Sequence, residues 1–189
     1  FSTLIDGYKK NELISKYGLG VYSLSSIPSD RALPAESLKA TTVWAAGIYV
    51  QKYLLSSKQI SNFRKNISIE QEDRSNGARG SFLMISSFKI KAKSSINWLI
   101  AAEINQDAGN IIGLINTIKK KNAYELVLND IEESKQILTK IVAQSDGMQL
   151  TGNKLNTARH FSNVLFNVMR GGIFDDSYNI EKEDFISFV

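Results

Sequence analysis

The residue most able to do chemistry in this sequence is His160, which is its only histidine. Metal sites usually combine several His, Cys or carboxylate ligands, and no HExxH-like spacing occurs here. A Ser-His-Asp triad would have to use His160, and no GxSxG motif accompanies it. We therefore favour a helix histidine in a polar contact. The alternative is a residue that contacts a sugar or a phosphate beside Arg159. No metal and no cofactor are predicted.

Acidic side chains occur in pairs, but their spacing does not favour catalysis. Glycoside hydrolysis needs two carboxyl groups that face each other across a cleft, roughly 5 to 9.5 Å apart. Carboxylates adjacent in sequence rarely achieve this, so we interpret these pairs as solvated faces or caps, and predict no catalytic residue. The groups are Glu70 with Glu72 and Asp73, Glu132 with Glu133, Asp175 with Asp176, and Glu183 with Asp184.

Two tryptophans, Trp44 and Trp98, are candidates for stacking on sugar rings. Each lies within an apolar run, so packing in a core is the favoured interpretation, and carbohydrate contact is the alternative. Arg170-Gly171-Gly172 could bind an anion through its guanidinium and bare amides. The glycines follow a predicted helix rather than precede one, however, so the helix dipole has the wrong sign and a helix stop is favoured.

Composition narrows the protein class further. The chain has 189 residues, 43% of them hydrophobic, which is ordinary for a globular protein. It has no cysteine, which excludes disulfides and thiolate chemistry and slightly favours the cytoplasm, although a periplasmic protein without disulfides would look the same. The net charge is +4 with dispersed basic residues, so we predict no nucleic-acid partner. No apolar run approaches the ~20 residues of a membrane helix, so we predict no membrane partner.

The elements that must position these residues are strands in the first half of the chain. Ser23–Leu38 contains both prolines and predicts a long loop. Thr41–Val50 is rich in β-branched and aromatic residues and predicts a strand, with a helix continuing to Leu55 as the alternative. Apolar alternation predicts two further strands, Phe82–Lys93 and Ile96–Ile104, joined as a hairpin.

Helical periodicity replaces strand alternation after Asn105. Asp107 is a predicted N-cap for a helix whose apolar face contains Ile111, Leu114, Ile115 and Ile118. Three more helices are predicted: one from Asn122 to Asp146-Gly147, one over Thr157–Arg170, and one from Glu181 onward. Because strands and helices are segregated, the fold class is α+β, with a β-sandwich-like antiparallel sheet in residues 1–105 and a helical subdomain in residues 106–189.

The order of these segments resembles a known family. The stretch TTVWAAGIYVQKYLLSSKQISNFR from Thr41 is followed by an acidic turn ending at Gly80, the pair SFLMISSFKIKAKSSINWLIAAEINQ, and AGNIIGLINTIKK. This order resembles the junction in large inverting disaccharide phosphorylases of the cellobiose and chitobiose type and in glucoamylase-like enzymes. In those proteins a galactose mutarotase-like β-sandwich is followed by linker helices and an (α/α)6 barrel.

The resemblance implies a non-catalytic sandwich-plus-linker portion of a carbohydrate-active enzyme, with an oligo- or polysaccharide as partner. The catalytic groups would lie in a C-terminal helical barrel missing from this chain, and both ends of the chain look cut, so we expect a fragment. A polar helix edge would lie nearest the substrate cleft. The alternative is a stand-alone protein- or ligand-binding scaffold domain without enzymatic activity. The edge consists of Arg159, His160, Asn163, Asn167 and Arg170.

Overall fold

The computed structural model describes residues 2–27, 37–173 and 181–189. The chain divides into two compact units, Phe1–Val127 and Leu128–Val189. All the described strands lie in the first unit, and helices dominate the second, which makes the protein α+β as predicted. The strand-to-helix change occurs near Asn105, as the periodicity indicated. The compact first unit nevertheless also includes the next helix and the start of the one after it.

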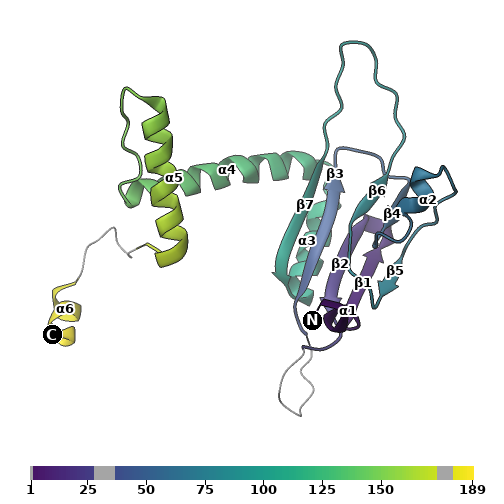
Figure 1. Ribbon diagram of the computed structural model, residues 1–189, viewed down its shortest axis with the longest axis horizontal. Coiled ribbons are helices and arrows are strands. Elements are labelled where there is room, and N and C mark those ends of the chain that lie inside the picture. Colours follow the sequence, from purple (N-terminus) through teal and green to yellow (C-terminus); the bar gives the residue numbers. More distant parts are fainter. Residues whose placement is uncertain (1, 28–36, 174–180) are drawn as a thin grey trace. The chain divides into compact units, whose positions relative to one another are not determined.

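A five-stranded antiparallel sheet organises the first unit, in the order β5-β1-β2-β3-β7 (Figure 1). Alternation of side chains gives this sheet two faces. One face carries Ile14, Val21 and Trp44, and the other carries Asn11, Tyr22 and Val43. The strands are β1 (Lys9–Ile14), β2 (Leu19–Leu24), β3 (Ala40–Ala46), β5 (Arg74–Asn76) and β7 (Leu99–Gln106).

Helix α3 (Ala108–Ile118) packs its apolar side on the first of these faces. The core there contains Leu19, Trp44, Leu114 and Ala123, with the predicted Ile111, Ile115 and Ile118 packed against it. Asp107 caps the helix as predicted, because its side chain accepts a 2.9 Å hydrogen bond from the Asn110 amide.

A smaller two-stranded sheet pairs β4 (Lys52–Leu54) with β6 (Leu83–Ile85). The predicted hairpin of 82–93 with 96–104 is therefore wrong, because β6 pairs with β4 while β7 pairs with β3. Only Leu83–Ile85 of the predicted strand 82–93 pairs, and the lysines after it lie exposed on a long connection drawn between β6 and β7 (Figure 1). The alternative of a helix through Leu55 is also wrong, since β3 and β4 occupy that stretch.

The described residues also contain three short α-helices and a 3-10 helix, Ser15–Tyr17. Helix α1 spans Ser2–Asp6, α2 spans Ile60–Arg64 and α6 spans Lys182–Phe188, the last agreeing with the helix expected after Glu181. The predicted loop Ser23–Leu38 begins later than expected, because Ser23 and Leu24 belong to β2. Residues 28–36 of that loop, and the pair Asp175-Asp176, lie outside the described residues.

The second unit is built from two longer helices. Helix α4 spans Ala123–Gln144, and its first turn belongs to the first unit, while α5 spans Lys154–Gly171. Helix α5 begins three residues before the predicted Thr157, because the Asn153 side chain accepts hydrogen bonds from the Leu155 and Asn156 amides. The turn between them contains Asp146, in the left-handed region with φ 61°, and Gly147, which agrees with the expected helix stop.

Candidate functional site

The face of the sheet opposite α3 holds a concavity with a volume of about 660 Å³. We call it the sheet pocket. Its base comes from a cross-strand row in which Asn11 pairs with Tyr22 and Tyr22 pairs with Thr41. Its described lining residues are Lys9, Asn11, Tyr22, Ser23, Leu24, Ser37, Lys39, Ala40, Thr41, Val43, Arg79, Gly80, Ser81, Phe82, Ile104 and Asn105.

A loop after β5 forms one wall of the sheet pocket, and two side chains of the sheet hold it. The Asn11 amide group, which is 2% exposed, donates to the carbonyls of Ser75 at 2.7 Å and Ala78 at 3.0 Å. The Tyr22 hydroxyl donates to the Ser81 carbonyl at 2.8 Å. Burial, with a smaller contribution from the Glu72 carboxylate, raises the pKa of Tyr22, so its hydroxyl remains a donor.

Gly80 lets this wall approach the sheet closely. A Cβ atom at this position would lie 2.6 Å from Cδ1 of Tyr22 and 2.8 Å from Oδ1 of Asn11. Any larger residue would therefore push the loop away from the two side chains that hold it.

A bulge in β7 shapes the opposite rim. Ala40 pairs with Gln106 and Thr42 with Glu103, so one residue of β3 faces both Ile104 and Asn105. Asn105 takes up the distortion with a φ of 60°, a conformation that asparagine tolerates better than most residues. Both bulge residues line the sheet pocket.

The chemical character of the sheet pocket is mixed. Three cations line it, Lys9, Lys39 and Arg79, together with an apolar group formed by Leu24, Val43, Phe82 and Ile104. Among its described lining residues none is Asp, Glu or His. This arrangement can bind a molecule through hydrogen bonds, charge and apolar contact.

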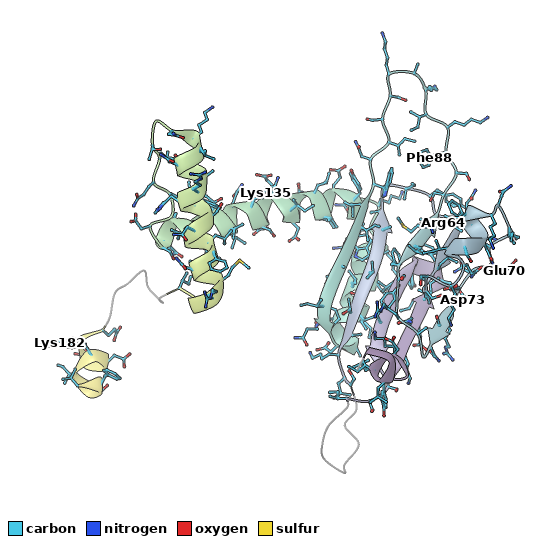
Figure 2. All side chains as sticks on the ribbon, viewed as in Figure 1. Arg64, Glu70, Asp73, Phe88, Lys135 and Lys182 are labelled. Carbon is cyan, nitrogen blue, oxygen red and sulfur yellow. The ribbon has the colours of Figure 1, made fainter. Side chains whose placement is uncertain are left out.

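The acidic cluster at 70–73 has a structural role instead. The Glu72 carboxylate accepts hydrogen bonds from the amides of Leu55 and Ser56, from the Ser56 hydroxyl and from Nε2 of Gln59 at 2.7 Å. The Asp73 carboxylate accepts from the Ser15 hydroxyl at 2.7 Å, which lowers the pKa of Asp73. Glu70 and Asp73 are labelled at the right of the first unit in Figure 2.

The predicted tryptophan candidates have different surroundings. Trp44 is 2% exposed and packs in the core under α3, so the sugar-stacking alternative is wrong for this residue and core packing is what occurs. Trp98 is 46% exposed, and its ring lies 6.2 Å from that of Phe88, between centroids. Trp98 therefore keeps an accessible ring face, whereas the core interpretation does not hold for it.

The predicted polar edge lies on α5, in the second unit. Nε2 of His160 lies 2.7 Å from the Asp146 carbonyl oxygen, which is the polar contact favoured from the sequence. The Arg170 guanidinium lies 5.5 Å from the centre of the Phe166 ring. A second concavity of about 580 Å³ lies in this unit, yet none of the predicted edge residues is among its described lining residues. The edge residues not yet placed are Arg159, Asn163 and Asn167, which are all exposed.

The sequence singled out none of the three cations of the sheet pocket. Lys9 precedes the expected strands, Lys39 lies at the end of the predicted loop, and Arg79 belongs to a turn. Nothing local marks them as a group, because only the pairing of β1, β2 and β3 brings the three segments together.

No protein-family model matches this chain, and no match to a curated protein is significant. Within the described residues, no group of three or more His, Cys, Asp or Glu side chains is placed to hold a metal ion. The helices that the structure describes include none long and apolar enough to cross a membrane.

Proposed function

We propose that this protein is a binding domain that holds a small organic molecule in the sheet pocket. The observation that carries the proposal is the pocket itself, at about 660 Å³, built on a regular sheet with both polar and apolar lining. Small-molecule sites typically have volumes of about 300–1,000 Å³ and combine apolar walls with a few polar groups. The sequence also allows a stand-alone ligand-binding scaffold domain, and the sheet pocket is the site that we propose for its ligand.

Two features support binding rather than a purely structural hollow. The wall is fixed by buried Asn11 and by Tyr22, so the pocket does not depend on ligand to form. A pre-formed site avoids the ordering cost that weakens binding to flexible surfaces. The absence of acidic and histidine side chains among its described lining residues favours retention of a ligand over its chemical conversion.

A fragment screen by saturation-transfer NMR tests this proposal, with a variant that fills the pocket. Thr41→Trp places an indole on the pocket face of β3, and we expect it to abolish fragment binding. Ala45→Trp is the matched control, because residue 45 lies on the same face of β3 but does not line the pocket. Fragments that bind Thr41→Trp as well as the wild type, or no binding by the wild type, would contradict the proposal.

A carbohydrate ligand, implied by the resemblance to disaccharide phosphorylases, remains a second candidate. It is supported by the exposed aromatic pair of Trp98 and Phe88, which offers ring faces suited to sugar C–H groups. Titration with cello- and chito-oligosaccharides should then change the fluorescence of the wild type but not of Trp98→Phe. If the fluorescence of the wild type stays unchanged, no sugar stacks on Trp98 and the carbohydrate candidate loses its support.

A further inference from the structure

We infer that the ligand of the sheet pocket is an organic anion with an apolar body; this inference rests on the proposed function. The three cations that line the pocket come from separate parts of the chain. Lys9 begins β1, Lys39 immediately precedes β3, and Arg79 lies in the loop after β5. Three cations lining one pocket, with no carboxylate among its described lining residues, favour a negatively charged ligand group.

The two lysines already have counter-charges. Lys9 pairs with Asp6 at 2.6 Å and Lys39 pairs with Asp107 at 3.1 Å, and neither aspartate lines the pocket. Arg79 makes no ion pair with any residue that the structure describes. Among the described residues, these three cations and the two paired carboxylates leave one positive charge without a counter-charge, that of Arg79.

The charge of Arg79 acts at the same rim as Lys9. The hydrogen bond from Lys9 is the main cause that lowers the pKa of Asp6, and the positive charges of Lys9 and Arg79 add to it. A ligand carboxylate placed between Lys9 and Arg79 would experience the same attraction. Arginine also presents two parallel N–H groups to a carboxylate, which a lysine cannot do.

The apolar lining residues indicate what the rest of the ligand should be. Leu24, Val43 and Ile104 present apolar surface, and Phe82 adds an aromatic ring that packs against Tyr53 with a centroid distance of 5.6 Å. A pocket lined by both cations and apolar side chains matches a molecule with an acidic group and a hydrocarbon or aromatic body. Inorganic phosphate would leave the apolar surface uncovered, so it should bind more weakly.

Isothermal titration with three probes tests the inference on the full chain. Phenylacetate carries both features, phenylacetamide is its neutral counterpart, and inorganic phosphate lacks the apolar body. We expect phenylacetate to bind at least about tenfold more tightly than phenylacetamide, because the carboxylate makes charge-assisted hydrogen bonds. The difference should shrink as the salt concentration rises. Equal affinity for phenylacetate and phenylacetamide would overturn the anion inference and leave the proposed binding function intact.

Two arginine variants locate the charge. Arg79→Met should weaken phenylacetate binding roughly fivefold or more, an effect limited by screening because Arg79 is exposed at the rim. The affinity for phenylacetamide should stay unchanged, because phenylacetamide carries no charge. Arg74→Met is the matched control, because Arg74 pairs with Glu12 at 2.9 Å and does not line the pocket. An equal loss in both variants, or no loss in Arg79→Met, would overturn the assignment.

Discussion

At the scale of single residues, the most connected side chain of the first unit is Glu72. Its carboxylate joins the segment after β4 to the segment before β5 through backbone amides, a hydroxyl and the Gln59 amide. Ser56, one of its partners, is 1% exposed. Because buried donors lose their water on folding, each of them needs an acceptor, and Glu72 satisfies several at once.

Replacing Glu72 by glutamine should destabilise the fold by about 1–3 kcal/mol, because the new NH2 group faces amide donors that it cannot satisfy. Urea unfolding followed by circular dichroism measures the change. Glu70→Gln is the control, since Gln59 contacts only the main chain of Glu70 and not its carboxylate. Equal midpoints for the two variants would mean that the Glu72 network contributes nothing measurable.

Gly80 allows a second prediction at this scale. Gly80→Ala introduces a methyl group into the space of Tyr22 and Asn11. We expect it to lower the free energy of unfolding by about 1–3 kcal/mol and to weaken ligand binding. Gly113→Ala is the opposite case, because nothing lies within 4 Å of the added Cβ and position 113 is inside α3. The free energy of unfolding of Gly113→Ala should rise by about 0.5–1 kcal/mol, because alanine has a higher helix propensity than glycine. Stabilisation by Gly80→Ala would show that the wall does not press on the sheet as described.

At the scale of elements, α3 determines which face of the sheet becomes core. Its apolar side covers Leu19 and Trp44, and the opposite face of the sheet is left for the wall and the sheet pocket. The start of α3 is tied to the pocket rim, because Asp107 both caps the helix and pairs with Lys39. Stability of α3 and charge at the pocket are therefore linked through one carboxylate.

The ionisation of Asp107 makes the stability of this element depend on pH. Its hydrogen bond with the Asn110 amide, followed by that with Lys39, lowers the pKa of Asp107 in the folded state. The stabilisation from the ionised cap is therefore complete above the unfolded-state pKa of about 3.9 and is lost as pH falls through the lower folded value.

Thermal unfolding between pH 6 and pH 2.5 tests this prediction against Asp107→Asn, which can still cap the helix but does not titrate. The melting temperature of the wild type should fall more than that of the variant across this range. Other carboxylates with a lowered pKa, Asp6 and Asp73, are present in both proteins, so the difference isolates Asp107. Parallel curves for the two proteins would contradict the prediction.

At the scale of the whole molecule, the first unit contains its own core. The buried cluster and its neighbours lie between Ile14 and Val127, the last residue of that unit. In the second unit, Val142 is the one fully buried large hydrophobic side chain among the described residues, and many apolar side chains on α4 and α5 are exposed. Stability should therefore be concentrated in the first unit.

A chain shortened to residues 1–135 should fold, because it retains the sheet, α3 and the first turns of α4. We expect a near-ultraviolet circular dichroism signal from buried Trp44 and a cooperative unfolding transition like that of the full chain. Loss of that signal or of cooperativity would show that the first unit depends on the second. Binding of the NMR fragments should also be retained, since all the described lining residues of the sheet pocket lie before residue 106.

Local signals in the sequence predicted the elements whose interactions are local. A helix is recognised by its 3.6-residue period and its cap, so the face of α3 and the role of Asp107 were predicted, as were the turn at Asp146-Gly147 and the strand containing Trp44. The α+β class followed from the order of those patterns. Strand partners were not predictable in this way, because adjacent strands need not pair, and β6 joins β4 across about 30 residues.

The residues of the sheet pocket are brought together only in the tertiary structure. Lys9, Lys39 and Arg79 are separated along the chain by stretches of about 30 and 40 residues, and the local sequence around each of them indicates no binding role. They meet because β1, β2 and β3 pair in a particular register and because Asn11 and Tyr22 hold the Gly80 loop against that face. Periodicity can show that a strand has two faces, but the choice between core and pocket depends on which face α3 covers, and that is a property of the packed molecule.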